Sequence, residues 1–227
     1  MKLSILLGLM PLFYSAANAA AIKEPHTHKG YFVTPWYTPP LEWQVEVDRN
    51  KTITVRGTLE DVRAEALKHN PNWERDYPPV AIDYDDDGDV ERDVTSASDS
   101  NVHKRSVNVK RAAQDFHAAQ IDCGRGESAE WMEALHRIQY LYGVKGKPTN
   151  GPGKGACTRV SCAYDTAVVW CNDDPYTKSL TSFSQIADGA MAILGQCYTN
   201  KMGEAKRVSG QAFHKNNWNV IVRQEGC

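Results

Sequence analysis

The chain has 227 residues, of which 41% are hydrophobic and 24% charged, and its formal net charge is −2. This length suits one or two domains, and the composition is that of an ordinary globular protein. Because the charge is balanced, nothing favours a nucleic-acid partner, and we expect none.

The first residues have the pattern of a secretory signal peptide. Lys2 precedes an apolar run at residues 3–13, and small residues with an Ala17-x-Ala19 cleavage pattern follow. The alternative is a membrane anchor, but the run is too short to cross a hydrocarbon core of about 30 Å. We therefore predict a signal peptide at residues 1–19 and a secreted, extracellular protein, with a host apoplast among the candidate locations.

The cysteines indicate a cross-linked domain. All six follow residue 122, and there is no C-x2-C pair of the kind that binds zinc. In an oxidising compartment we expect them to form three disulfides, in a pairing that the sequence does not determine. The expected half-cystines are Cys123, Cys157, Cys162, Cys171, Cys197 and Cys227.

Residues 20–111 form a predicted acidic prosegment, with 13 Lys and Arg against 17 Asp and Glu. Alternating apolar residues at 43–47 and 53–55, joined by turn chemistry, predict a hairpin. A short helix should follow within a small unit at about 41–70, which we expect to need the downstream domain for stability.

That short helix has a start signal, an apolar stripe and a stop signal. Thr58 and Asp61 are typical of a capped helix start, and Asn70-Pro71 of its end. The predicted apolar stripe consists of Leu59, Val62, Ala66 and Leu67.

The predicted hairpin turn carries the tripeptide Asn50-Lys51-Thr52, an acceptor sequence for N-glycosylation. We consider Asn50 a candidate glycosylation site because turns are exposed.

A linker is predicted at about 83–111. The Asp-x-Asp-x-Asp-Gly run that begins at Asp83 resembles the start of a calcium loop, but Val94 stands where such a loop needs a bidentate Glu. We favour an acidic solvated linker, and a disordered composition continues to residue 100.

Two dibasic pairs end this linker, just before the cysteine-rich region. Such pairs in a flexible, secreted segment are typical substrates of a kexin-like processing protease, whose pocket recognises Arg through charge-assisted pairing. We predict cleavage there, which leaves a mature domain at residues 112–227. The predicted processing residues are Lys104, Arg105, Lys110 and Arg111.

The predicted mature domain has two helices and three strands. Helices should run from near Ser128 to Gly143, and from a capping box at residues 182–185 to Cys197. Strands are predicted at 159–164 and 166–171, which form a central hairpin, and at 218–223. This order predicts an α+β fold in which two amphipathic helices pack on a small antiparallel sheet, cross-linked by disulfides.

Several stretches of this domain resemble a known class of proteins. They are Cys157-x4-Cys162, Val-Val-Trp-Cys-Asn-Asp at 168–173, Ile-Ala-Asp-Gly-Ala at 186–190, and Ser-Gly-Gln at 209–211 followed by Trp-Asn-Val-Ile-Val at 218–222 and Cys227.

These stretches resemble the small secreted cysteine-rich proteins of fungi, an effector-candidate class made as kexin-processed precursors. More distantly, the helix-on-sheet layout is similar to the killer toxins of smut fungi, which are α/β sandwiches with more cysteines. The resemblance covers about residues 123–227 and implies an effector-like or toxin-like protein.

A hydrolase is the alternative reading. A histidine and a glutamate could form the acid/base pair of a secreted ribonuclease, with an arginine for phosphate. Nothing in the sequence brings any two of these residues together. The candidates are His117, His136, His214, Glu127, Glu130, Glu133, Arg159 and Arg223.

We favour action by binding, and expect no catalytic residue, metal or cofactor. Charged loops on a cross-linked body suit recognition of a host protein, a membrane or a glycan. A third possibility is a cell-wall or antifungal, killer-toxin-like protein. The predicted binding loops, which include a mobile basic loop at 145–155, contain Lys145, Lys147, Lys154, Lys206, Arg207, His214 and Lys215.

Overall fold

The computed structural model describes residues 40–82, 116 and 120–227, all within one compact unit, Trp36–Cys227. We call residues 40–82 the N-terminal segment, and residues 120–227 with Phe116 the cysteine-rich part. The predicted signal peptide, the linker at 83–111 with its calcium-like run and both processing pairs, and His117 lie outside the described residues.

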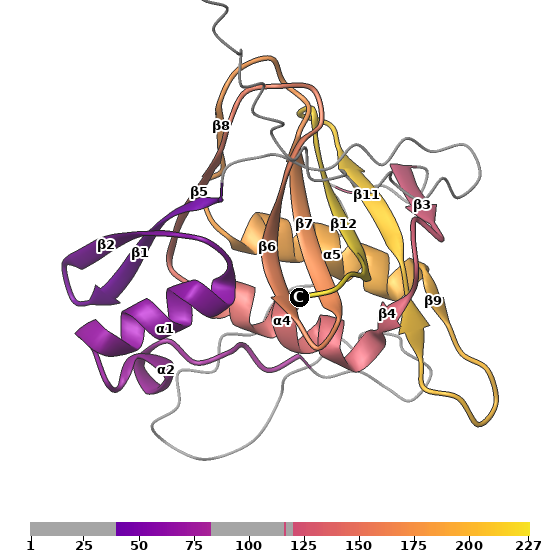
Figure 1. The fold of residues 1–227 in the computed structure, drawn as a ribbon, viewed down its shortest axis with the longest axis horizontal. Helices are drawn as coiled ribbons and strands as arrows, with labels where there is room; N and C mark the ends of the chain where they lie inside the picture. The colour runs from indigo at the N-terminus through magenta and orange to yellow at the C-terminus, as the bar shows by residue number, and fades with distance from the viewer. Residues whose placement is uncertain (1–39, 83–115, 117–119) are drawn as a thin grey trace, which may run out of the picture. The chain divides into compact units, whose positions relative to one another are not determined.

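A five-stranded antiparallel sheet is the centre of the cysteine-rich part (Figure 1). Its strand order is β3-β11-β12-β7-β6, and two helices, α4 (Trp131–Gly143) and α5 (Ser184–Gln196), pack against it and against each other. The predicted α+β class is confirmed. The strands are β3 (Ile121–Cys123), β11 (Gly210–His214), β12 (Trp218–Gln224), β7 (Thr166–Asn172) and β6 (Ala156–Ala163).

The predicted central hairpin is confirmed as β6 and β7. Tyr164 and Asp165 form its turn, both with positive φ (50° and 53°), as a two-residue turn of type I′ requires. Val168 and Trp170 point from β7 into the core, and Trp170 is fully buried. The alternation along the strand therefore fixes which face of the sheet receives the helices.

Both predicted helices of the mature domain are present, with shifted starts. Residues Ala129–Glu130 form strand β4, which pairs with β10 (Arg207–Val208), so α4 begins at Trp131 instead of near Ser128. In the second helix, Gln185 accepts hydrogen bonds from the backbone N–H and hydroxyl of Thr181, rather than pairing with Ser182. The N-cap residue of α5 is Phe183, which has helical φ and ψ and makes no side-chain cap hydrogen bond, so the predicted capping box at Ser182 is wrong.

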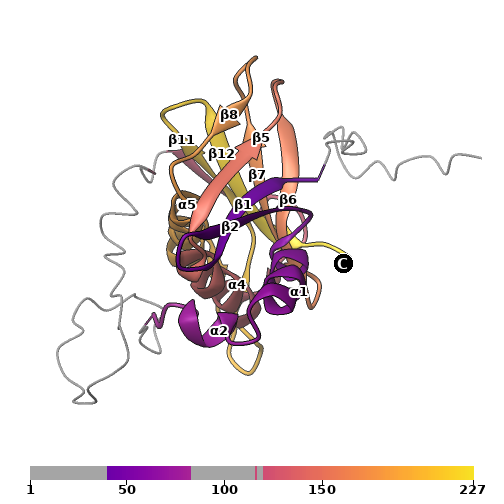
Figure 2. The ribbon, with the colours of Figure 1, turned by 90° about the vertical axis from the view of Figure 1, so that its left-hand side faces the viewer.

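A second sheet joins the N-terminal segment to the cysteine-rich part (Figure 2). The predicted hairpin is confirmed as β1 (Glu42–Asp48) and β2 (Lys51–Arg56). Strand β1 also pairs with β5 (Gly146–Asn150), which pairs in turn with β8 (Lys178–Ser179). The expected mobile loop at 145–155 is therefore wrong for residues 146–150, because β1 offers them an edge to pair with.

Two helices follow the hairpin: α1 (Leu59–His69) and α2 (Trp73–Asp76). The predicted end of α1 at Asn70 is confirmed, and the Asn70 side chain donates a hydrogen bond to the Val47 carbonyl. The predicted apolar stripe is wrong for Leu67, which is 36% exposed because it faces away from the hairpin side of the helix. Leu59, Val62 and Ala66 are buried as predicted.

One continuous core includes side chains from both parts of the chain. The predicted processing sites therefore lie between two segments that share one core. Cleavage there would leave the side chains of that core on two separate chains. Its largest fully buried side chains are five tryptophans: Trp43, Trp73, Trp131, Trp170 and Trp218.

Three disulfides cross-link the cysteine-rich part, and all six expected half-cystines take part. Cys123 on β3 pairs with Cys197 after α5, Cys157 pairs with Cys171 across the central hairpin, and Cys162 pairs with Cys227. In the described residues, no helix is both long and apolar enough to cross a membrane.

Candidate binding cleft

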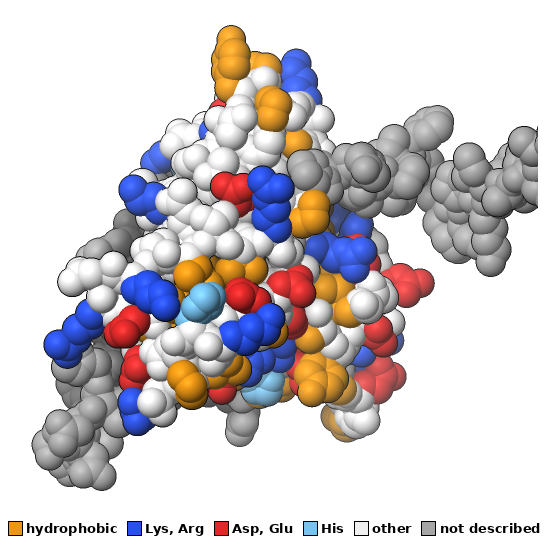
Figure 3. All heavy atoms as spheres, turned by 60° about the vertical axis from the view of Figure 1, so that its left-hand side comes forward, with side chains coloured by type: hydrophobic (Ala, Val, Ile, Leu, Met, Phe, Trp, Pro, Cys, Tyr) orange, Lys and Arg blue, Asp and Glu red, His pale blue; other side chains and the backbone are white. Residues whose placement is uncertain are grey.

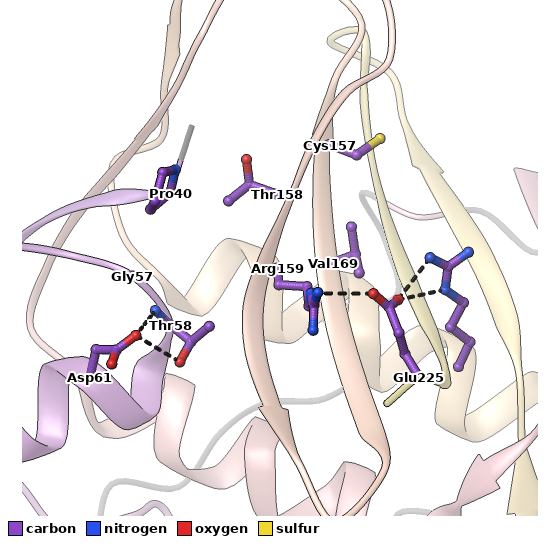
Figure 4. A pocket seen from close by; sticks show the side chains of 10 residues that line it. Pro40, Gly57, Thr58, Asp61, Cys157, Thr158, Arg159, Val169 and Glu225 are labelled. Atoms are coloured by element: carbon purple, nitrogen blue, oxygen red, sulfur yellow. Dashed lines mark hydrogen bonds and ion pairs between the residues drawn. The ribbon is translucent and has the colours of Figure 1, made fainter. Parts of the chain in front are cut away.

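A cleft lies between the N-terminal segment and the outer face of the main sheet, and has a volume of about 420 Å³ (Figure 4). The N-terminal segment supplies Pro40, Gly57, Thr58 and Asp61. The cysteine-rich part supplies the other wall: Cys157, Thr158, Arg159, Val169, Arg223 and Glu225.

The first wall is built by the start of α1. Gly57 has a φ of 137°, a conformation that suits glycine and turns the chain from β2 into the helix. The Asp61 carboxylate then accepts hydrogen bonds from the backbone N–H of Thr58 at 2.8 Å and from its hydroxyl at 3.3 Å. This cap holds a negative charge at the rim of the cleft (Figure 4).

The second wall is built by two arginines on either side of one glutamate. Glu225 pairs with Nε of Arg159 at 3.2 Å, and accepts hydrogen bonds from Nε and an η nitrogen of Arg223 at 3.0 and 2.7 Å. Arg159 also donates to the Gly226 carbonyl at 3.1 Å. Together with the Cys162–Cys227 disulfide, these contacts hold the C-terminal tail against the sheet.

The two walls carry opposite charge. Arg159, Arg223 and Glu225 sum to one positive charge, whereas Asp61 gives the facing wall one negative charge. Because 46% of the Arg159 side chain is exposed, its guanidinium can reach a ligand. This arrangement fits an extended ligand that carries both charges, such as a peptide segment, better than a purely anionic one.

The surface around the N-terminal segment is also mixed in charge. Figure 3 shows acidic and basic side chains interspersed over this face, without a single-sign patch.

The predicted binding residues are spread over the fold and are not all in loops. Lys147 lies in β5, Arg207 in β10 and His214 in β11, so the loop prediction is wrong for these three. The reason is strand pairing with distant partners, which local composition does not show. Lys145, Lys154, Lys206 and Lys215 lie outside strands and helices.

Lys206 and Arg207 hold neighbouring elements in place. Lys206 Nζ lies over the rings of Trp131 and Tyr198, at 4.7 and 4.1 Å from their centroids. Arg207 donates hydrogen bonds to the Ser128 carbonyl and to the Gln224 side chain. Their positive charges therefore help to position β10 and the start of α4.

The described residues of the hydrolase alternative do not come together in one site, although His136 lies near Glu133 and the two arginines share one wall of the cleft. His136 lies on the solvent side of α4 near Glu133, whereas His214 is buried and stacks on Trp218 with ring centroids 4.4 Å apart. Glu127 and Glu130 precede α4, and Arg159 and Arg223 lie in the cleft wall.

The predicted glycosylation residue Asn50 is exposed in the β1–β2 turn, where its φ is 64°. Its modification remains a prediction.

Two tyrosines and Asp174, all outside the cleft, have pKa values shifted from their ordinary values. Burial, and then the hydrogen bond from its hydroxyl to Glu46, raises the pKa of Tyr77 to about 12. Burial, and then the nearby Asp188 carboxylate, raises the pKa of Tyr142 well above its usual value. The hydrogen bond from Lys178, with one from Asn217, lowers the pKa of Asp174. All three groups stabilise the fold by fixing contacts between elements.

The cleft residues of the N-terminal segment have no sequence pattern that indicates a binding site. Thr58 and Asp61 have only the pattern of a helix start, and no local signal shows that this start faces β6. In the described residues, no cluster of three His, Cys, Asp or Glu could hold a metal ion.

No family model, curated protein or solved structure matches this chain.

Proposed function

We propose that this chain is a secreted, disulfide-cross-linked effector-like or toxin-like protein that acts by binding a protein of a host or a competitor. In this proposal the cleft between the N-terminal segment and the main sheet is the recognition site. The observation that carries it is the pair of oppositely charged walls, Asp61 facing Arg159, on a body cross-linked by three disulfides.

The charged residues of the cleft are held rigidly. A binding site is most effective when its groups are held in place before the ligand arrives, because less conformational entropy is then lost on binding. Here Asp61 is fixed by the helix cap, and Arg159 by Glu225 and the Gly226 carbonyl. The disulfide at Cys227 fixes the tail that carries Glu225.

The charge pattern favours a protein target. A membrane surface or a nucleic acid attracts a patch of one sign. The cleft and the face in Figure 3 carry both signs instead, which suits a peptide segment with its own acidic and basic groups. Secretion and cleavage at the dibasic pairs belong to the same proposal, supported by the sequence patterns and by disulfides of the kind that persist in oxidising compartments.

The first test is the intact mass of the secreted protein under non-reducing, denaturing conditions. We expect a species that begins near Ser106 or Ala112, with three disulfides and therefore a mass about 6 Da below that of the reduced chain. A full-length product with free thiols would contradict the proposal.

The second test separates the biological roles. The purified protein is applied to plant tissue and to competing fungi, and compared with an Asp61→Asn variant. Asparagine keeps an oxygen that can accept from Thr58 but removes the charge from the cleft, so we expect loss of the response without loss of folding. The matched control is Asp122→Asn on β3, which removes an exposed charge away from the cleft. Equal responses from the two variants would rule out the cleft.

A further inference from the structure

We infer that the N-terminal segment stays bound after the linker is cut, so that the mature protein consists of two chains held together without a covalent bond. The inference rests on the cleavage in the proposed function. The contacts between the two chains do not depend on which target the protein binds, so they can be tested without knowing the target.

The first contact is a shared sheet. Strand β1 pairs with β5, with Trp43 opposite Pro148 and Val45 opposite Gly146. Two further backbone hydrogen bonds cross between the parts: the Glu46 N–H donates to the Lys145 carbonyl at 3.2 Å, and the Val80 N–H to the Gln139 carbonyl at 3.0 Å. Loss of the N-terminal segment would expose the edge of β5 and leave these carbonyls without their partners.

The second contact is a polar cluster around Glu60. Its carboxylate accepts hydrogen bonds from the Ser161 hydroxyl at 2.7 Å and from the Cys162 N–H at 3.1 Å. It also pairs with Arg137 at 3.5 Å. Arg137 and Ser161 are buried, and burying an ion or a hydroxyl is costly without a partner. The N-terminal segment supplies the acceptor for Ser161, and it supplies a second carboxylate for Arg137, which also pairs with Glu133 of its own helix at 3.6 Å.

The third observation is the close approach of backbones at two glycines of the cysteine-rich part. A Cβ on Gly146 would lie 1.9 Å from the Gln44 carbonyl oxygen, and a Cβ on Gly143 would lie 2.4 Å from that of Pro78. Both clashes are with the N-terminal segment. The absence of a side chain at these two positions thus fits a cysteine-rich part that folds with residues 40–82 in place.

The association is non-covalent because all three disulfides lie within the cysteine-rich part. The cleft also needs both chains, since Asp61 and Arg159 come from different sides of the cut. Release of the N-terminal segment would remove one wall of the proposed binding site.

The test uses the purified full-length protein, cut in vitro by a kexin-type protease. We expect both chains to elute as one species in native size-exclusion chromatography at about 10 μM, and to appear as separate masses under denaturing, non-reducing conditions. Elution of the N-terminal chain by itself would overturn the inference. A linker that resists the protease would also overturn it, because the two-chain form would then not arise.

A matched pair of variants tests the interface itself. Glu60→Gln weakens three contacts with the other chain, so we expect the N-terminal chain to be released at least about tenfold faster on dilution, followed by tryptophan fluorescence. Glu65→Gln on the same helix is the control, since the Glu65 partners Lys68 and His69 lie within α1. Equal release rates for the two variants would overturn the assigned interface.

These results are distinguishable from a failure of the proposed function. If the tissue and fungal assays show no response but the cut chains co-elute, the proposed target is wrong and the two-chain form stands. If the chains separate but the isolated cysteine-rich chain is active, the two-chain inference is wrong and a binding function stands.

Discussion

The indole of Trp43 stacks on the ring of Phe183, with centroids 4.1 Å apart and planes 15° apart. Both side chains are fully buried, and the Trp43 indole N–H donates to the Gly57 carbonyl at 2.9 Å. The two residues lie on opposite sides of the predicted processing pairs. A segment that the sequence identifies as removable therefore provides a central side chain of the core.

Trp43→Ala should destabilise the whole protein and not only the hairpin. Truncation of a buried tryptophan leaves a cavity and removes the stacking contact, so we expect a loss of about 3–5 kcal/mol in the free energy of unfolding. Urea unfolding followed by circular dichroism measures it. The control is Thr54→Ala on β2, which is exposed and should change stability by less than about 0.5 kcal/mol. Similar values for the two variants would mean that the N-terminal segment is not part of the core.

The three disulfides should differ in their contribution to stability. The Cys123–Cys197 bond spans 74 residues and the Cys157–Cys171 bond spans 14. In the chain-entropy account, the longer loop should stabilise by about 4–5 kcal/mol and the shorter by about 3 kcal/mol. The paired variants Cys123→Ala with Cys197→Ala, and Cys157→Ala with Cys171→Ala, measure this by urea unfolding. A larger loss from the second pair would contradict the entropic account for this fold.

Stability should fall in alkaline solution, partly through Tyr77. Its folded pKa of about 12 lies above the ordinary value of 10, so between these values the unfolded chain loses a proton that the folded chain retains. The stabilising contribution is fully present below pH 10 and is lost as the pH rises to about 12. Tyr142 contributes in the same direction.

Tyr77→Phe should therefore make the decline between pH 10 and 12 less steep, as measured by urea unfolding at a series of pH values. At pH 7 the same variant should lose only about 1 kcal/mol, from the hydrogen bond to Glu46. An unchanged alkaline slope would show that the Tyr77 hydroxyl ionises equally in both states.

His214 should behave as a packing residue. Its ring stacks on Trp218 and meets Phe116 edge to face at 5.2 Å. We expect His214→Ala to lower the free energy of unfolding by about 1–3 kcal/mol, whereas the exposed His136→Ala should have little effect. The ribonuclease alternative makes the opposite prediction: RNA cleavage that is lost in His214→Ala while the stability is retained.

Local patterns predicted the regular elements well. Alternation at residues 43–47 and 218–222, the β-branched and aromatic run at 166–171, and helical spacing along α4 and α5 reflect which side chains face a core, and that information lies within each segment. Short strands such as β3, β4 and β10 were not predicted, because two or three residues carry no readable period. Each exists through a partner far away in the chain.

Strand β5 shows most clearly which structure a local sequence pattern does not predict. Its residues, Gly-Lys-Pro-Thr-Asn, have the composition of a loop, and they form a strand because β1 provides matching N–H and C=O groups. The cleft was missed for the same reason. Asp61 and Arg159 each have an ordinary local explanation, as a helix cap and a strand residue, and their position across a cleft depends on how α1 docks against β6.

The sequence by itself determined the α+β class, the main helices and hairpins, and the six cysteines that form disulfides, because propensity, periodicity and cysteine content are properties of short segments. Only the tertiary structure decided which cysteines pair, and that residues 40–82 share a core with residues 120–227. Those outcomes depend on the free energy of contacts between distant segments, such as Trp43 with Phe183, which no local pattern encodes.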